Sequence, residues 1–469
     1  MPEKYHIETH PVPPRRPRIG KCGVVDWRED CAGCHNCVKR ACVFDRYKEE
    51  AQYIRSLSDV DALFFHCMGC FSCVQQCTKG LLALSLNPVY ERLGNTYWTP
   101  EIIETTWYQA ETAKIPVSGA GYRGKFSGAG FDSMWTDMSE IVRPTRDGIH
   151  GREYISTAVD IGRKPSLLLF EGNKPTSALP SLVDIPMPLI IDMMPPEYRL
   201  PKLIPVFKAV AARTGLLMIV NAQDWDLLGD DKEHYLPHLV FYLGAGAPLP
   251  QKEVLQKTRL VEINDDATVC QRIQELKDVH PGIVVAVRVE LDSRGTERAI
   301  ELAQQQSVEV LHLVADTDGN QIAVENPRFM KDMVRQIHNS LVRSGIRNEI
   351  TLIAGGGIAL PEHMAKQIIC GADLVTINLP LLIALECHLC TTCRTGPSCP
   401  ARIEEIDFEY GVGRMTNLIS AWHDQLIEVM GAMGIREVRR LRGEVGRALF
   451  FEDLEEATFA KLFGSRKSV

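Results

Sequence analysis

The chain has 469 residues, of which 45% are hydrophobic and 24% are charged, and its formal net charge is −8. This length suits two or three domains at roughly 150 residues each, and the composition is that of a globular protein. A negative charge without a basic face argues against nucleic acid and anionic membranes as partners. No stretch reaches the roughly 18 apolar residues of a bilayer span, and the first residues lack the centre of a secretory signal, so we expect a cytoplasmic protein.

Residues 1–20 are rich in proline and arginine and predict an extended arm. Residues 21–90 then contain two cysteine runs, each with three cysteines separated by two residues and a fourth slightly beyond. The runs are Cys31, Cys34, Cys37 and Cys42, and Cys67, Cys70, Cys73 and Cys77. Between them, residues 47–65 predict an amphipathic helix.

Three closely spaced thiolates and a fourth are typical of ferredoxin-like loops that bind a [4Fe-4S] cluster. In two-cluster ferredoxins the fourth cysteine of each run ligates the other cluster, so the expected ligand sets exchange their last members. These sets are Cys31, Cys34, Cys37 and Cys77, and Cys67, Cys70, Cys73 and Cys42. An extra residue before Cys42, and the lack of a following proline, leave this exchange open. Two zinc sites are the alternative, although structural zinc usually draws on separated cysteine pairs.

Residues 91–180 are glycine-rich with few periodic segments and predict a connector. Residues 119–124 match the G-x-G-x-x-G pattern of dinucleotide sites. No hydrophobic strand precedes this match and no helix follows it, so we do not interpret it as a nucleotide site.

Residues 181–400 alternate short apolar runs with helical stretches, as in a parallel sheet with crossover helices. Eight runs occur, which predicts a (β/α)8 barrel of the TIM type, with a doubly wound open sheet as the alternative. The runs are 188–194, 216–222, 239–244, 260–264, 283–289, 308–315, 350–355 and 373–378.

The seventh run ends in Gly355, Gly356 and Gly357, and Pro361 opens the next helix. In such barrels a phosphate binds after strands seven and eight, where glycine allows backbone amides to approach it. We therefore expect a flavin phosphate at this loop; a tight turn without a ligand is the alternative.

A third cysteine run follows the eighth strand and contains Cys387, Cys390, Cys393 and Cys399. We expect a [4Fe-4S] or [3Fe-4S] cluster there, close to the glycine loop, where it could exchange single electrons with a flavin. Cys22 is expected to be a free thiol near solvent. Cys270 and Cys370 are expected to be packed core thiols.

The two ferredoxin runs, the segment 98–101 and the stretch from Gly355 through Cys399 resemble the archaeal-type form of the glutamate synthase family. The resemblance implies an FMN-binding barrel with the phosphate at Gly355–Gly357 and a cluster at the third run. Several family elements are altered: 221–224 after strand two, 263–266 after strand four, Arg288 in place of a lysine, and 316–319 after strand six. Residues 378–380, Asn-Leu-Pro, replace a glycine and a small hydroxyl residue.

Two functions follow from this pattern. In the first, the chain is an oxidoreductase of this family that passes electrons through three clusters to FMN. In the second, it is an electron-relay subunit whose barrel has lost its substrate chemistry, with or without loss of its flavin. We expect no glutaminase half, because residues 1–2 are Met-Pro, and no dinucleotide site. A hetero-oligomer with a pyridine-nucleotide flavoprotein, a glutaminase or a ferredoxin is therefore expected.

Polar residues at the strand ends could face a cofactor, although each could equally serve as a helix cap or in a salt bridge. They are Asp192, Met193, Asn221, Arg288, Asp316 and Asp318. No general acid or base can be named. Residues 401–469 predict a helical C-terminal segment, apolar on one side from Met415 to Met430, and 436–442 predict a solvated arginine-rich face.

Overall fold

The computed structural model describes residues 5–16, 19–26, 38–41, 43, 70, 72–115, 130–136, 154–176, 179–390, 399–443, 445–458 and 460–464. The chain divides into two compact units. The N-terminal unit contains Pro13–Thr105 and Glu386–Ala401, and the barrel unit contains Met1–Val12, Thr106–Leu385 and Arg402–Val469. The expected helix at 47–65 and the glycine pattern at 119–124 lie outside the described residues.

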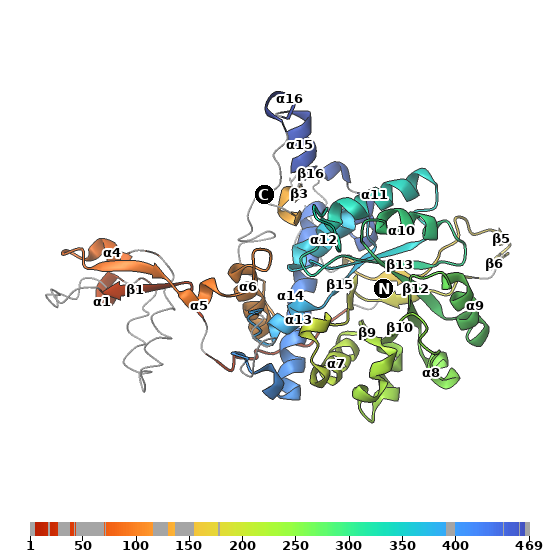
Figure 1. Ribbon diagram of the computed structural model, residues 1–469, viewed down its shortest axis with the longest axis horizontal. Helices are drawn as coiled ribbons and strands as arrows, with labels where there is room; N and C mark the ends of the chain where they lie inside the picture. The colour runs from red at the N-terminus through yellow and green to blue at the C-terminus, as the bar shows by residue number, and fades with distance from the viewer. Residues whose placement is uncertain are drawn as a thin grey trace. The chain divides into compact units, whose positions relative to one another are not determined.

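Eight parallel strands close into a barrel in the barrel unit (Figure 1). They are β8 (Leu189–Ile191), β9 (Leu217–Asn221), β10 (Leu239–Leu243), β11 (Leu260–Asn264), β12 (Val284–Glu290), β13 (Val310–Val314), β14 (Thr351–Gly355) and β15 (Leu374–Ile377). The barrel closes where Ile377 of β15 pairs with Ile191 of β8. Seven of these strands lie within predicted runs, and β12 extends one residue beyond its run, to Glu290, so the barrel is confirmed and the open sheet is wrong.

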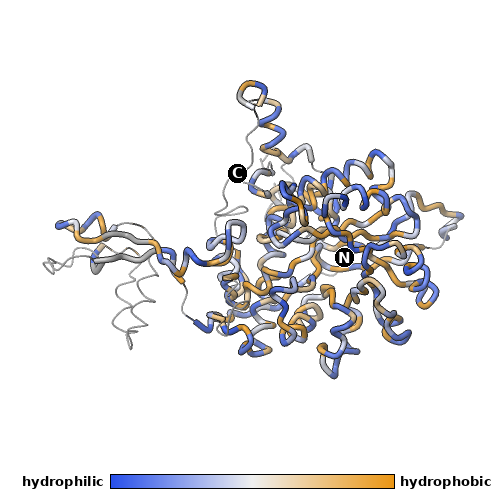
Figure 2. The backbone as a smooth tube through the Cα atoms, viewed as in Figure 1, coloured by the Kyte–Doolittle hydropathy of each residue, from blue (hydrophilic) through white to orange (hydrophobic). Residues whose placement is uncertain are grey.

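The strands are apolar because both of their faces are covered. Their hydrophobic residues are almost all fully buried, and the hydrophobic stretches gather in the centre of the barrel (Figure 2). Runs of valine, isoleucine and leucine are typical of such parallel strands, which have the barrel interior on one side and helices on the other.

Each strand is followed by a helical segment on the outside of the barrel. These segments are α7 (Ile204–Thr214), the 3-10 helices η6 (Ala222–Leu228) and η7 (Lys232–His238), α8 (Lys252–Lys257), α9 (Val269–Val279), α10 (Gly295–Ala303), α11 (Met330–Arg343), α12 (Pro361–Ile369) and α13 (Leu379–Ala384). Pro361 stands at the start of α12, as predicted from its fixed φ angle.

The C-terminal segment is dominated by α14 (Phe408–Met433), which packs against α7, α12 and α13. Asp407 caps the helix by accepting the backbone N–H groups of Glu409 and Tyr410, at 3.0 and 3.3 Å. Gly434 ends it in the left-handed conformation, at φ 70°. The predicted apolar side from Met415 to Met430 is buried, so the helical tail is confirmed. Residues of the expected arm lie against α14, because Asn417 Nδ2 donates to the carbonyl of His10 at 2.9 Å.

A short antiparallel pair, β4 (Val159–Ile161) and β7 (Val183–Ile185), lies at the amino end of the barrel. There Thr351, the first residue of β14, exchanges hydrogen bonds with the backbone of Gly162. The remaining short elements of this unit are η1 (Gly130–Ser133), β3 (Met134–Thr136), β5 (Phe170–Glu171), β6 (Lys174–Pro175), η10 (Val438–Gly443), β16 (Ala448–Phe450), α15 (Phe451–Ala457) and α16 (Ala460–Phe463).

The described part of the N-terminal unit contains one antiparallel pair, β1 (Cys22–Asp26) with β2 (Leu82–Leu86). Its helices are α1 (Val38–Ala41), α4 (Ser72–Gln76), α5 (Pro88–Glu91) and the start of α6 (Pro100–Thr112). The third cysteine run belongs to this unit, whereas the sequence grouped it with the barrel. His388, for example, accepts the backbone N–H of Gly94 at 2.9 Å.

Of the two unpaired cysteines of the barrel, Cys370 is buried as predicted, and burial raises the pKa of its thiol to about 12. The prediction for Cys270 is wrong, because Cys270 is exposed near the start of α9, where its Sγ contacts Gln305 Oε1 at 2.9 Å. The amphipathic pattern placed this cysteine on the wrong side of its helix.

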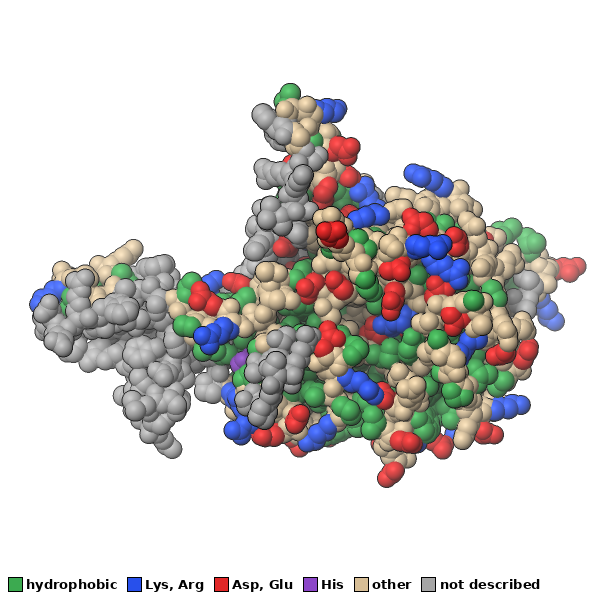
Figure 3. Space-filling model, viewed as in Figure 1, with side chains coloured by type: hydrophobic (Ala, Val, Ile, Leu, Met, Phe, Trp, Pro, Cys, Tyr) green, Lys and Arg blue, Asp and Glu red, His purple; other side chains and the backbone are tan. Residues whose placement is uncertain are grey.

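Acidic and basic side chains are interspersed on the visible face of the barrel unit (Figure 3). Among the residues that the structure describes, no helix is long and apolar enough to cross a membrane.

Candidate active site

A buried ion-pair network lies inside the barrel near the carboxyl ends of its strands. Arg288 of β12 contacts Asp192, which follows β8, at 3.1 and 3.2 Å, and Glu262 of β11 at 2.8 Å. The side chains of Asp192 and Glu262 are 3% and 1% exposed, and that of Arg288 is 15% exposed. Arg288 is thus held between two buried anions and retains a small solvent-facing surface.

His312 of β13 extends this network across the barrel. Its Nδ1 lies 2.9 Å from Glu262 Oε2, and its Nε2 lies 3.2 Å from Thr376 Oγ1 on β15. Thr376 in turn donates to Asp192 Oδ2 at 3.4 Å. His312 thus connects Glu262 to Thr376, and Thr376 connects the network back to Asp192.

The electrostatics of the network favour its charged forms. Burial alone would raise the pKa of Asp192, but the neighbouring Arg288 and His312 outweigh burial and lower it. Burial acts on Glu262 in the same way, and His312 and Arg288 again hold its pKa below the usual range. The two carboxylates in turn raise the pKa of Arg288 against the opposing effect of its burial. The guanidinium is therefore a permanent cation at this end of the barrel.

The predicted glycine loop adjoins this network. A Cβ on Gly355 would lie 2.3 Å from Thr376 Oγ1 and 3.0 Å from His312 Nε2. Gly356 has φ 101°, and a Cβ there would meet the carbonyl oxygen of Asp316 at 2.5 Å. Only glycine fits these positions. Within the described part of the chain, the backbone N–H groups of Gly356 and Ile358 donate to no acceptor.

The loop after Gly357 is fixed by the first turn of α12. His363 Nδ1 accepts the backbone N–H of Ala359 at 3.2 Å, and its ring stacks on Phe131 at 4.6 Å. Burial and the nearby Lys366 lower the pKa of His363 to about 3, so the ring is neutral and can accept this bond. The loop is therefore held in one conformation with two amides left to bind an anion.

The loop after β15 is built differently. Asn378 Oδ1 accepts the N–H of Leu379 at 2.7 Å, and Asn378 Nδ2 donates to the carbonyl of Met193 at 3.3 Å. Pro380, at the start of α13, has no N–H to offer. This loop satisfies itself, so an anion at the carboxyl end would be bound from the β14 side only.

The other predicted site residues serve local structure. Asn221 caps η6 by accepting the N–H of Gln223 at 3.0 Å. Asp316 accepts the N–H groups of Asp318 and Asn320 and closes the turn after β13. Met193 donates its N–H to Asp192 Oδ1 at 2.8 Å, so it fixes the carboxylate through its backbone. The structure thus brings Asp192, Arg288 and the glycine loop together and leaves the other predicted side chains in structural roles.

Sequence reasoning missed Glu262, His312 and Thr376. Each is the polar residue inside a strand whose neighbours are apolar and buried. A polar residue in a fully buried strand must find a partner, because an unpaired one costs roughly 1–3 kcal/mol. That pattern was available in the sequence and would have indicated the network.

Six of the twelve clustered cysteines belong to the described residues, all within the N-terminal unit. They are Cys70, Cys73, Cys77, Cys387, Cys390 and Cys399, and the predicted ligands Cys31, Cys34, Cys37, Cys42, Cys67 and Cys393 lie outside the described residues. Within the described part, no group of three histidine, cysteine, aspartate or glutamate side chains is placed to hold a metal ion.

Two of the described thiols receive hydrogen bonds of the kind that stabilise metal-bound thiolates. Cys77 Sγ accepts the N–H of Leu81 at 3.2 Å, and Cys387 Sγ accepts the N–H of Leu389 at 3.4 Å. The amides of Leu81 and Lys79 lower the pKa of Cys77. Backbone amides directed at cysteine sulfur are one of the features that tune iron-sulfur centres, so these residues fit such a ligand role.

The chain is similar to known glutamate synthases. The conserved region of glutamate synthase matches residues 249–436, which include Glu262, Arg288, His312 and the glycine loop. The archaeal-type glutamate synthase [NADPH] of Dehalococcoides mccartyi is 26% identical, with 90% of this chain and 93% of that protein aligned. The resemblance to the glutamate synthase family is therefore confirmed.

Two further glutamate synthases align over a similar share of the chain. The archaeal glutamate synthase [NADPH] of Methanocaldococcus jannaschii is 24% identical over 95% of each chain, and that of Archaeoglobus fulgidus is 24% identical over 92% of this chain and 95% of that protein. Among solved structures, the flavin-binding domain of baker's yeast flavocytochrome b2 aligns with 12% identity, covering 82% of this chain and 94% of that chain, at a TM-score of 0.44.

Proposed function

We propose that this chain is an iron-sulfur flavoprotein oxidoreductase of the glutamate synthase family. In this proposal FMN binds at the carboxyl end of the barrel and three clusters bind the twelve cysteines. One observation carries it: the charged guanidinium of Arg288 lies beside the glycine loop, where the amides of Gly356 and Ile358 have no acceptor within the described part of the chain. A fixed cation and free amides suit an anionic cofactor.

The residues present fit the phosphate of FMN at the β14 loop. Gly356 lets the backbone approach a ligand, and the start of the nine-residue helix α12 adds its positive dipole. Arg288 would supply positive charge at the barrel mouth, held by Asp192 and Glu262. The bound flavin would supply hydride transfer and single-electron exchange. The chain's own residues bind it, orient it and keep charge fixed near it.

The cysteines would bind the clusters that deliver electrons. Two of the described thiols, those of Cys77 and Cys387, accept backbone N–H groups, which supports a thiolate ligand role. The spacing of the cysteines favours iron-sulfur clusters over zinc. We further propose that the chain works in a hetero-oligomer. Its reducing equivalents would come from another redox subunit, such as a pyridine-nucleotide flavoprotein or a ferredoxin, and ammonia from a glutaminase.

A second function has specific support at the rim. Asn378 closes the loop after β15 by accepting the N–H of Leu379. Asp265 lies in a loop whose sequence differs from that of the family, and it forms a bidentate ion pair with Arg298. Both side chains thus stabilise their own loops. An electron-relay subunit, with a barrel that lacks substrate chemistry, would retain the cysteines and tolerate such a rim.

Metal and flavin analysis of anaerobically purified protein tests both functions. The oxidoreductase requires about one FMN and roughly twelve iron atoms per chain if all three clusters hold four irons. A full iron load without flavin would support the relay, and zinc in place of iron would contradict both.

A pair of cysteine variants sharpens the test. Cys390→Ala should remove about four iron atoms, or about three if its cluster is the three-iron form, and change the electron paramagnetic resonance spectrum of the reduced protein. Cys270→Ala is the matched control, because Cys270 is exposed and bonded to Gln305 outside the three runs. Equal iron in Cys390→Ala and Cys270→Ala would remove Cys390 from the ligand set.

A further inference from the structure

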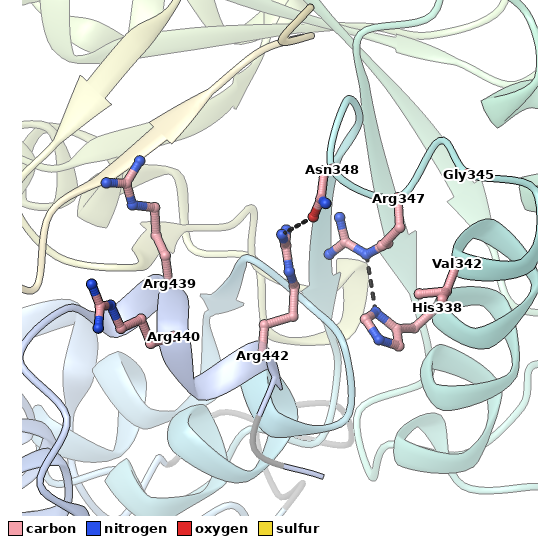
Figure 4. A pocket seen from close by; sticks show the side chains of 8 residues that line it. All are labelled: His338, Val342, Gly345, Arg347, Asn348, Arg439, Arg440 and Arg442. Atoms are coloured by element: carbon pink, nitrogen blue, oxygen red, sulfur yellow. Dashed lines mark hydrogen bonds between the residues drawn. The ribbon is translucent and has the colours of Figure 1, made fainter. Parts of the chain in front are cut away.

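A cavity of about 560 Å³ opens at the amino end of the barrel, opposite to the glycine loop (Figure 4). It lies between the last turns of α11, the turn that leads into β14, and η10. Four of its lining residues are arginines: Arg347, Arg439, Arg440 and Arg442. Its volume falls within the range of roughly 300–1,000 Å³ typical of small-molecule sites.

The inner wall of the cavity is rigid. Arg347 is 3% exposed and donates to the carbonyls of Ile350 and Gly371 and to Asp373 Oδ2, the last at 2.9 Å. Its Nε also donates to His338 Nδ1 at 3.1 Å (Figure 4). These contacts fix the orientation of the Arg347 guanidinium. Ligand binding would therefore cost little conformational entropy at this side chain.

His338 acts as a neutral acceptor in this wall. Its burial, together with the charges of Arg347 and Arg442, lowers the pKa of the ring to about 4. It therefore stays uncharged at neutral pH and adds no positive charge of its own. The positive charge of the cavity comes from arginine alone.

The outer wall is more exposed and less neutralised. Arg442 contacts Asp373 and donates to Asn348 Oδ1 at 2.8 Å (Figure 4). Arg439 is 52% exposed and contacts Asp160 at 3.1 Å, and Arg440 is 70% exposed and, among the described residues, forms an ion pair with Glu437 alone, at 3.7 Å. The predicted solvated face is therefore wrong for Arg442, whose side chain is 22% exposed and ion-paired.

The cations of this cavity outnumber its anions. Four guanidiniums share three carboxylates, those of Asp160, Asp373 and Glu437. Asp160 is also shared with Lys164, at 3.4 Å. An excess of positive charge over a concave surface attracts anions.

From this geometry we propose that the amino-terminal cavity is a binding site for a phosphate-bearing small molecule. Guanidinium groups match phosphate oxygens with paired hydrogen bonds, which a single ammonium cannot do. The exposed side chain of Val342 offers an apolar surface for the remainder of such a ligand. The site uses none of the residues assigned to FMN or the clusters, so it does not depend on the proposed function.

Calorimetric titration of the full-length, cofactor-loaded protein tests this site, with pyrophosphate and adenosine monophosphate as probes at constant ionic strength. We expect saturable binding at one site per chain for at least one probe. Arg440→Glu should weaken it by about tenfold or more, because it reverses one charge at the mouth of the cavity. Arg440→Lys should bind more tightly than Arg440→Glu but less tightly than the unchanged protein. Lysine restores the positive charge but not the paired hydrogen bonds of a guanidinium.

Arg213→Ala is the control, because Arg213 is an exposed arginine in the last turn of α7 that does not line the cavity. Binding by Arg213→Ala should equal that of the unchanged protein. The proposal is overturned if neither probe saturates, or if Arg440→Glu binds as tightly as Arg213→Ala. Arg440 is exposed, so unchanged thermal unfolding is expected in all three variants and a folding defect would not be confused with lost binding.

Discussion

At the carboxyl end of the barrel one guanidinium, that of Arg288, lies between two buried carboxylates, whereas at the amino end four guanidiniums share three carboxylates around an open cavity. Ion pairs in the interior must be compensated, because an unpaired buried charge costs several kcal/mol. Exposed charges need no such partner, since water solvates them. At the surface, positive charge that is not neutralised by a carboxylate can therefore attract a ligand. In the interior, only the small exposed part of the Arg288 side chain can do so.

The largest expected effect comes from removing the cation that neutralises the two buried carboxylates. Arg288→Met leaves Asp192 and Glu262 as buried anions facing each other, and should lower the free energy of unfolding by about 3–5 kcal/mol. Chemical denaturation at neutral pH measures this difference.

The matched control for that change is Arg298→Met. Arg298 also pairs with a carboxylate, that of Asp265, but its side chain is 32% exposed. The expected loss is about 0–1 kcal/mol. Similar losses in the two variants would contradict the claim that burial, rather than pairing itself, makes the interior network costly to break.

The second effect concerns a carboxyl group at the same end whose burial outweighs the opposing charge of Lys366. Glu362 opens α12, and burial raises its pKa from 4.5 to about 7. Its Oε2 accepts a hydrogen bond from Gln425 Nε2 at 3.1 Å. The folded state therefore retains a proton that the unfolded state has lost between pH 4.5 and 7, and stability should fall as the pH rises through this window.

The fall attributable to Glu362 should be at most about 3 kcal/mol, because the side chain keeps some contact with water. Glu362→Gln keeps the acceptor for Gln425 and cannot ionise, so it should be relatively more stable than the unchanged protein above pH 7. Thermal unfolding of both proteins at pH 5 and pH 8 measures the effect. Parallel pH profiles would show that Glu362 is not the titrating group.

Much of the fold could be predicted because the barrel leaves a local signal in every strand. Each apolar run, such as Ile350–Gly355, must be buried on both faces, and its length and β-branched content favour a strand. The start of α12 at Pro361 and the long apolar side of α14 were predictable for similar local reasons.

The candidate site was less predictable because it depends on long-range contacts. The pairing of Arg288 with Asp192 joins residues 96 positions apart in the chain, and no local pattern fixes it. The same holds for the cavity at the amino end, where Arg442 of η10 meets Asp373 at the start of β15. Residues that appear as a solvated basic segment in sequence become a pocket only when the barrel brings α11 beside them.

The smallest expected effect concerns the self-satisfied loop after β15. Asn378→Ala removes the acceptor for the N–H of Leu379 and should lower the free energy of unfolding by about 1 kcal/mol, whereas Asn378→Gly should cost only a few tenths. Asn221→Ala, at the equivalent cap of η6, is the control for a cap away from the network and should cost a similar amount. Because the anion is expected to bind from the β14 side only, Asn378→Gly and Asn378→Ala should retain equal amounts of flavin during purification. A difference in flavin content between the two variants would contradict this assignment.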